Sequence, residues 1–162
     1  MMVRADLEVG GESLKLCCGA EVDALRRGKI PVEFKTVWEG KDGGFFRNMS
    51  TVLQSELVGV KTIVTGIKKG DIGKGEVVVH KVVEKQVEDI KSNGNIGKTA
   101  PQCYSFLFTV LTELKRFLEY SECCEMSFNP YRGVVEFKRI SKQVAERNGN
   151  GVTREFLARF HL

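Results

Sequence analysis

A long amphipathic stretch between Thr99 and Ser121 restricts the fold of this chain more than any other feature. Its apolar residues recur at intervals of three and four, which is the spacing of one face of an α-helix. They are Cys103, Phe106, Leu107, Val110, Leu111, Leu114, Phe117 and Leu118. A helix with one continuous apolar face has to bury it, so we predict a sheet packed against a helix at about 99–121.

The residues before this helix permit two interpretations. The run Gly97–Thr99 matches the end of a phosphate loop, in which glycine amides and a lysine surround nucleotide phosphates. However, Ser92 stands where that motif requires its first glycine, and the segment before it is too polar for a buried strand. Thr99 and Gln102 have the spacing of a helix capping box. We therefore favour a structural helix start, and nucleotide binding by a degenerate phosphate loop remains a third alternative.

The rest of the chain has the pattern of short strands separated by turns. Strands are predicted over 3–9, 13–22, 31–38, 60–67 and 76–87, with a closing β-hairpin over 125–140. Short helices are predicted over 49–58 and 153–160, and flexible loops over 91–98 and 148–151. Because strands and helices do not alternate, we expect an α+β fold. It would be a single domain over 1–162, with one mostly antiparallel sheet packed on the long helix.

The cysteines and histidines do not form a recognisable catalytic or metal-binding pattern. The chain has 5 cysteines, no C-x-x-C motif, and 2 histidines. We expect reduced, mostly buried thiols in a cytoplasmic or nuclear compartment, and His80 in the core or at the edge of a sheet. No apolar run is long enough to span a membrane, and the first residues lack the core of a signal peptide. These observations predict a protein that is not an enzyme, with no metal, cofactor or small-molecule substrate.

The chain is basic, and its basic residues indicate a surface for anions. The net charge is +4 and its excess lies in residues 132–162. A Gly/Lys-rich loop over 66–75 could contact phosphates, or it could be a solvated connection between strands. The candidate nucleic-acid or anion-binding residues are Lys68, Lys69, Lys74, Arg26, Arg27, Arg139 and Lys142.

An aromatic pair, Phe45 and Phe46, follows two glycines and precedes Arg47. Aromatic side chains on a hinged loop beside a cation can insert into a membrane interface or a partner's pocket. The alternative is that the pair folds back over the core as a lid. We therefore take Phe45 and Phe46 as candidate membrane- or partner-binding residues.

The order of these elements resembles that of rhabdovirus-type matrix proteins, including those of plant rhabdoviruses. The resemblance rests on N-terminal strands, a central sheet, the helix QCYSFLFTVLTELKRFLEY and the hairpin EMSFNPYRGVVEFKRI. It implies an oligomeric protein of the virion that condenses nucleocapsids and associates with membranes. No proline-rich budding motif stands near the N-terminus.

The sequence thus predicts a non-enzymatic structural or binding protein. It would self-associate as a homo-oligomer and engage nucleic acid, nucleoprotein or an anionic membrane surface. The alternative is a small basic nucleic-acid-binding or regulatory protein. We expect it in the cytoplasm or nucleus, and in a virion if the matrix-like interpretation holds.

Overall fold

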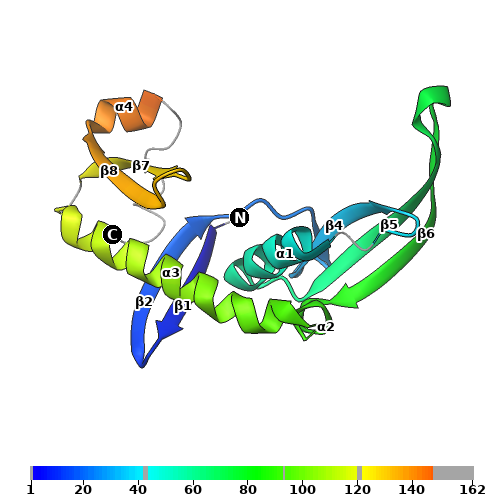
Figure 1. Ribbon diagram of the computed structural model, residues 1–162, viewed down its shortest axis with the longest axis horizontal. Helices are drawn as coiled ribbons and strands as arrows, with labels where there is room; N and C mark the ends of the chain where they lie inside the picture. The colour runs from blue at the N-terminus through cyan, green and yellow to red at the C-terminus, as the bar shows by residue number, and fades with distance from the viewer. Residues whose placement is uncertain (1, 42–43, 93, 120–121, 148–162) are drawn as a thin grey trace. The chain divides into compact units, whose positions relative to one another are not determined.

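The chain has an α+β fold in the computed structural model of Figure 1. The structure describes residues 2–41, 44–92, 94–119 and 122–147. It divides into two compact units, Met1–Phe106 and Leu107–Leu162. The single domain over 1–162 stays a prediction. No helix in the described part of the chain is long and apolar enough to cross a bilayer.

An antiparallel hairpin opens the first unit. Strands β1 (Met2–Val9) and β2 (Glu12–Gly19) pair along their whole lengths, with Val9 opposite Glu12. Gly10 and Gly11 form the turn with φ values of 61° and 84°. A two-residue turn with both φ values positive suits glycine, and its twist matches that of the flanking strands. The predicted hairpin is confirmed, although β2 ends three residues before the predicted boundary at 22.

A four-stranded sheet forms the centre of the first unit. Its strands lie in the order β3 (Ala24–Arg26), β4 (Ile30–Trp38), β5 (Thr62–Asp71) and β6 (Glu76–Gln86). Strands β4 and β5 are parallel, because the helix α1 (Gly44–Val58) connects them and returns the chain to the same end of the sheet. The prediction of one mostly antiparallel sheet is therefore wrong in detail. The described strands form three sheets, and the largest contains a parallel pair.

Helix α1 supplies the centre of the hydrophobic core. Figure 1 shows it beside the four-stranded sheet, and it begins five residues before the predicted start at 49. Its core residues pack with residues of β5, of α2 (Val87–Lys91) and of the start of α3 (Asn95–Phe117). The cluster consists of Met49, Val52, Val60, Ile63, Val87, Ile96 and Ala100.

The long helix α3 begins at Asn95, so Thr99 is not its N-cap. Residues 95–98, predicted as part of a flexible loop, form its first turn, and Lys91 belongs to α2. The reason is tertiary packing, because Ile96 on this turn and Ala100 just after it are buried in the core. A Cβ on Gly97 would lie 2.9 Å from the backbone oxygen of Lys91. This glycine therefore allows α2 and α3 to approach closely.

The apolar stripe of α3 is only partly buried. Val110 is buried, whereas Phe106 is 58% exposed. The remaining predicted stripe positions are half-buried. The helix also ends at Phe117, short of the predicted end at 121. Among the described residues, α1 and α3 each contribute two residues to the buried core cluster: Met49 and Val52 from α1, and Ile96 and Ala100 from the start of α3.

The hairpin of β5 and β6 extends beyond β4 as a two-stranded ribbon. Pairing of β5 with β4 ends at Lys68, whereas pairing with β6 continues to Asp71 opposite Glu76. A 3-10 turn, η1 (Ile72–Lys74), closes the ribbon at its end (Figure 1). Much of the predicted Gly/Lys-rich loop is therefore strand. A two-stranded ribbon satisfies the backbone hydrogen bonds that an irregular loop would leave to water.

The second unit contains the predicted closing hairpin, which is confirmed. Strands β7 (Cys123–Asn129) and β8 (Val134–Ile140) are antiparallel. The side chain of Asn129 closes the turn, since its Oδ1 accepts from the backbone N–H groups of Tyr131 at 3.1 Å and Arg132 at 3.2 Å. A short helix, α4 (Lys142–Arg147), follows. The predicted loop 148–151 and helix 153–160 lie outside the described residues.

Candidate active site

A pocket of about 470 Å³, which we call the acidic pocket, lies between β4 and α1. Three carboxylates, those of Glu21, Asp23 and Glu33, line it together with the ammonium of Lys35. The helix contributes Thr51, Gln54 and Ser55. The interface between a helix and a sheet is normally apolar, so the half-buried charges of Glu33 and Lys35 at this place indicate a site for a polar ligand, and the exposed Glu21 and Asp23 add two carboxylates to its lining.

The geometry of the sheet brings these side chains together. Glu33 and Lys35 are two residues apart on β4, so their side chains point to the same face. Their side chains are 21% and 28% exposed, and both line the pocket beside α1. Strand β3 pairs antiparallel with β4, with Ala24 opposite Val32. One step further along this register places Asp23 beside Glu33.

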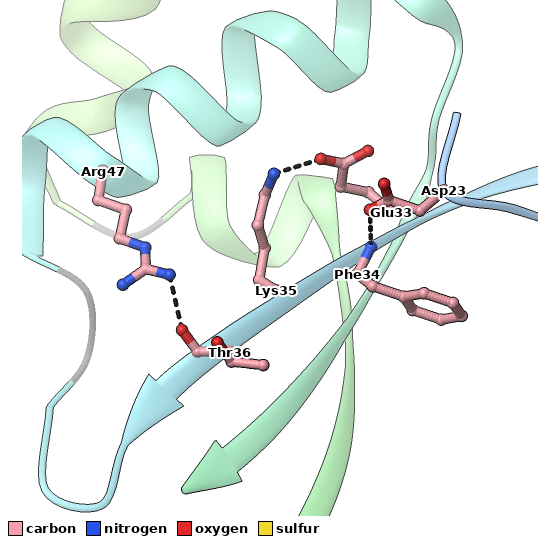
Figure 2. Close-up of polar contacts among 6 residues, drawn as sticks. All are labelled: Asp23, Glu33, Phe34, Lys35, Thr36 and Arg47. Carbon is pink, nitrogen blue, oxygen red and sulfur yellow. Dashed lines mark hydrogen bonds and ion pairs between the residues drawn. The ribbon is translucent and has the colours of Figure 1, made fainter. Parts of the chain in front are cut away.

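Hydrogen bonds hold two of the three acidic groups, those of Asp23 and Glu33, in place, as Figure 2 shows. The Lys35 ammonium donates to Oε1 of Glu33. The backbone N–H of Phe34 donates to Oδ2 of Asp23 at 2.7 Å. From α1, Nη2 of Arg47 donates to the backbone oxygen of Thr36 at 2.6 Å. These contacts tie the segment before β3 and the start of α1 to the one strand that carries Glu33 and Lys35.

The donor atoms of the acidic pocket suit a hard divalent cation. Carboxylate oxygens are the ligands that Mg²⁺, Ca²⁺ and Mn²⁺ prefer. Glu21, Asp23 and Glu33 contribute such oxygens to the lining of the acidic pocket. Within the described ranges, no group of three or more His, Cys, Asp or Glu side chains is arranged so that it could hold a metal ion as the structure stands. Carboxylate oxygens fit a cation chemically. In the structure, those of Asp23 and Glu33 accept hydrogen bonds from the Phe34 N–H and the Lys35 ammonium.

A second pocket, which we call the basic pocket, adjoins the first. It has a volume of about 340 Å³ and shares Lys35 and Thr51 with the acidic pocket. Lys41, Arg47 and Lys85 also line it, and Asp89 is its one acidic residue among those that the structure describes. A carboxylate-rich pocket and a cation-rich pocket thus lie next to each other under α1.

The predicted anion-binding residues are dispersed in the first unit. Arg26 forms an ion pair with Glu84 at 2.6 Å, and the adjacent Arg27 has a positive φ of 50°. Lys68 lies over the ring of Trp38, 5.2 Å from its centroid. The register of β3, β4 and β5 places Arg26 and Lys68 at opposite ends of β4. They do not form one surface.

Two predicted lysines lie on the ribbon of β5 and β6. Lys69 and Lys74 are exposed there, Lys69 on β5 and Lys74 in η1. Neither residue lines the acidic pocket or the basic pocket. Their anion-binding role stays a prediction.

In the second unit, Arg139 is engaged in local contacts. It donates to the backbone oxygen of Phe117 at 2.6 Å and to Oε2 of Glu122 at 3.0 Å. Its guanidinium also lies over the Phe117 ring, 4.5 Å from the centroid. Lys142, at the start of α4, is exposed. The role of both residues in anion binding stays a prediction.

The aromatic pair lies in the first turn of α1 rather than on a loop. Phe45 and Phe46 contact each other edge to face, with centroids 5.4 Å apart. Phe46 is 86% exposed, so it does not cover the core as a lid. Membrane or partner binding by this pair remains a prediction.

The cysteines are more accessible than predicted. All five are free; Cys17 is exposed and the other four are half-buried. Burial and the neighbouring Cys123 raise the pKa of the Cys124 thiol above its ordinary value. His80 was predicted in the core or at a sheet edge, and it lies on the edge strand β6. Its Nε2 is 3.2 Å from Oε1 of Glu39.

The sequence interpretation missed the acidic pocket. A signal was available in two short patterns, Glu21-Val22-Asp23 and Glu33-Phe34-Lys35. The second pattern places two charged residues on one face of β4. The second pattern interrupts a strand that is otherwise largely apolar. Such a strand has to cover its charged face with a site or with solvent.

Comparison with solved structures shows similarity to Rai1 proteins from yeasts. The chain resembles Scheffersomyces stipitis Rai1 in complex with (3'-NADP)+ and calcium ion, with 19% identity and a TM-score of 0.63, over 96% of this chain and 44% of that one. A second structure of S. stipitis Rai1 gives 20% identity and a TM-score of 0.62, over 99% and 46%. Candida albicans Rai1 in complex with pU5-Mn2+ gives 18% identity and a TM-score of 0.60, over 96% and 45%. No family model matches the sequence, and no curated protein sequence matches it.

These similarities correct two predictions and establish the fold alone. The resemblance to rhabdovirus matrix proteins is wrong, since the structural neighbours are Rai1 proteins, and with it the matrix and virion roles lose their support. The prediction of a non-enzymatic protein is contradicted as well, because these neighbours are enzymes. The chain spans less than half the length of the Rai1 chains that it matches.

Proposed function

We propose that this chain forms the active-site part of a divalent-cation-dependent enzyme that acts on phosphate linkages of RNA or nucleotides. The acidic pocket carries this proposal: three carboxylates and a lysine line one cavity under α1. The similar Rai1 structures contain (3'-NADP)+ with calcium in one case and pU5 with Mn2+ in another. A nucleotide and a hard cation are the ligands that this combination of side chains suits.

Each side chain of the pocket has a chemical role in this proposal. Glu21, Asp23 and Glu33 would hold the cation, which neutralises phosphate charge and acts as a Lewis acid when it is bound. The Lys35 ammonium can contact a phosphate oxygen from the same face of β4 that carries Glu33. The amide of Gln54 on α1 can hydrogen-bond the ligand from the opposite wall. The half-buried position of Glu33 and Lys35 strengthens these electrostatic contacts relative to those in bulk water.

The test measures cation binding and turnover on the whole chain. Mn²⁺ and 5'-phosphorylated pentauridylate are titrated into the protein by calorimetry, and RNA products are followed by gel electrophoresis with Mn²⁺ or with EDTA. We expect Mn²⁺-dependent binding and product formation. Asp23→Asn and Glu33→Gln are expected to lower both at least tenfold, because each removes one negative oxygen ligand. Glu12→Gln removes an exposed carboxylate on β2 and serves as the matched control.

Retention of wild-type Mn²⁺ binding in both pocket variants would overturn the proposal. A second candidate function, nucleic-acid binding without catalysis, is supported by the basic pocket. It predicts RNA binding that is the same with Mn²⁺ and with EDTA, and no product. The same titration therefore separates the two candidates.

A further inference from the structure

The outer edge of β6 is open and apolar. Among the described strands, β6 ends the order of the four-stranded sheet, and Figure 1 shows it outside β5. One row of its backbone N–H and C=O groups therefore faces away from the sheet. Its exposed valines are Val77, Val78, Val79 and Val82, with exposed fractions of 39%, 56%, 51% and 62%. A long edge strand with exposed apolar side chains is a place where another strand can add.

A β-bulge divides β6 into two segments. Lys81 pairs with Ile67 of β5, whereas Val79 pairs with the next residue of β5, so His80 is an extra residue in β6. Nε2 of His80 lies 3.2 Å from Oε1 of Glu39, which follows β4. This contact directs the extra side chain toward the sheet rather than toward the open edge.

The bulge reverses the face to which the side chains of β6 point. Lys85 pairs with Ile63, which packs in the core with residues of α1, so Lys85 lies on the α1 face. Val79 lies on the other face, because its Cγ1 is 3.1 Å from the position of a Cβ on Gly66, three residues along β5 from Ile63. The pairing with β5 assigns every position in this way. The face opposite α1 carries Val77, Val79, Val82 and Glu84, and the α1 face carries Glu76, Val78, Val83 and Lys85.

These faces make β6 complementary to a second copy of itself. Two antiparallel strands related by a two-fold axis perpendicular to their sheet keep each face on its own side, so opposed residues must share a face. With the axis between His80 and Lys81, the segment before the bulge opposes the segment after it, and each opposed pair shares a face. In a strand without a bulge, the same positions would lie on opposite faces.

The opposed pairs combine apolar contacts with opposite charges. Two of the four pairs are apolar, and one joins a carboxylate to an ammonium, which are the combinations that stabilise neighbouring strands. In the fourth pair, Glu84 keeps its ion pair with Arg26 at 2.6 Å, so its charge is already offset. The two-fold axis repeats every pair. The pairs between the copies are Val79 with Val82, Val78 with Val83, Glu76 with Lys85, and Val77 with Glu84.

We propose that the outer edge of β6 is an interface between two copies of this chain, in which β6 of one copy runs antiparallel to β6 of the other. The pairing joins two four-stranded sheets into one continuous sheet. A second copy is the partner that fits, because one strand supplies both members of each pair, Glu76 and Lys85 included. Neither Val79 nor Val82 lines the acidic pocket, so the inference goes beyond the proposed function and does not depend on it.

The interface is small, so the dimer should be weak. Stable complexes bury about 1,200–2,000 Å² in total, and a single pair of strands lies at or below the lower end of that range. Lys81 also stands beside the two-fold axis in both copies, and lysines on edge strands oppose pairing. We therefore expect a dimer with a micromolar Kd that exchanges with the monomer.

Sedimentation velocity of the whole chain at increasing concentration measures this Kd. Val82→Lys is expected to weaken the dimer at least tenfold, because the ammonium would lose water against Val79 of the second copy. Ile72→Lys is the matched control, since Ile72 is 71% exposed in η1 and lies outside the paired segments. The control should keep the wild-type Kd within about twofold. Both side chains are largely exposed, so circular dichroism should show wild-type folding in both variants.

Charge reversal tests the pairing of Glu76 with Lys85. Glu76→Lys and Lys85→Glu each oppose like charges across the interface and should each weaken the dimer several-fold. The double variant Glu76→Lys/Lys85→Glu restores opposite charges to the same pair and should recover a Kd close to that of the wild type. A wild type that stays monomeric at every concentration, a dimer unaffected by Val82→Lys, or a double variant no better than the single variants would overturn the inference.

Discussion

The carboxylate of Asp23 accepts a hydrogen bond at 2.7 Å from the backbone N–H of Phe34, on the strand that carries Glu33 and Lys35. This bond connects the segment before β3 to the middle of β4. It places an acidic side chain beside Glu33 and also satisfies a backbone donor. One residue of the candidate site therefore has both a structural and a chemical role, and substitutions can separate the two.

Asp23→Asn should keep the structure and lose the chemistry. An amide oxygen can still accept from the Phe34 N–H, so we expect the free energy of unfolding to stay close to that of the wild type. Asp23→Ala removes the acceptor and should destabilise the protein by about 1 kcal/mol. Both variants should bind Mn²⁺ more weakly. Urea unfolding and calorimetry measure the two effects, and unchanged Mn²⁺ binding in Asp23→Asn would contradict the assignment of this carboxylate.

Gly97→Ala should destabilise the protein because its methyl group would lie 2.9 Å from the backbone oxygen of Lys91. Overpacking of this kind costs about 1–3 kcal/mol. Lys98 is exposed, and Lys98→Ala should change the free energy of unfolding by less than about 0.5 kcal/mol. Urea unfolding measures both. A loss of nucleotide binding in Lys98→Ala, with stability retained, would instead support the phosphate-loop interpretation of this segment.

Acid should weaken the contacts of Glu122 in the second unit. The backbone N–H of Glu119 and the guanidinium of Arg139 donate to its carboxylate and hold its pKa below the ordinary value of 4.5. A carboxylate with a lowered folded-state pKa contributes stability that is present above the unfolded-state value and is lost as the pH falls through the folded-state value.

The comparison of wild type with Glu122→Gln tests this pH dependence. The two proteins should differ in free energy of unfolding at pH 7, and the difference should shrink as the pH falls below 4.5. Urea unfolding at several pH values measures it. A difference that stays constant from pH 7 to pH 3 would show that the charge of Glu122 does not contribute.

Tyr104→Phe should destabilise the first unit. The Tyr104 hydroxyl donates to Oε2 of Glu56 at 2.5 Å, and Lys91 donates to Oε1 of the same carboxylate at 2.7 Å. Burial, followed by the bond to Glu56, raises the pKa of Tyr104, so the hydroxyl stays a donor at neutral pH. Hydrogen bonds to charged groups contribute about 1.5–3 kcal/mol, and partial exposure places the expected loss near the lower end.

Tyr131→Phe is the control for Tyr104→Phe, since Tyr131 is 98% exposed in the turn between β7 and β8. Thermal unfolding should show a lower Tm for Tyr104→Phe and no change for Tyr131→Phe. Equal Tm values for wild type and Tyr104→Phe would show that the contact with Glu56 does not stabilise the folded state.

The local turns and strands could be predicted because their causes are local. Gly10 and Gly11 permit the positive φ values of a tight hairpin turn, and Asn129 closes the turn between β7 and β8 through its own side chain. Such features depend on a few neighbouring residues. Helix boundaries were less predictable, since Ile96 and Ala100 extend α3 towards its N-terminus by packing against α1 and β5.

The candidate site could not be predicted from local patterns. Asp23 and Glu33 are ten positions apart, and only the antiparallel register of β3 and β4 makes them neighbours. Thr51 and Gln54 reach the same pocket because α1 crosses back over a parallel pair of strands. No local sequence pattern predicts that α1 crosses over between two parallel strands. The pattern of lysines near glycines predicted a site at Lys68, Lys69 and Lys74, and none of these residues lines the acidic pocket.

The sequence by itself determined the α+β class, the two hairpins and the existence of one long helix, because backbone preferences and side-chain periodicity act over a few residues. Tertiary structure decided the parallel pairing of β4 with β5, the start of α3 at Asn95, and the meeting of Glu33 with Asp23. These depend on contacts between residues distant in sequence. Burial of Val52 of α1 against Ile63 of β5 holds them in place, and the same packing leaves Glu33 and Lys35 facing a pocket.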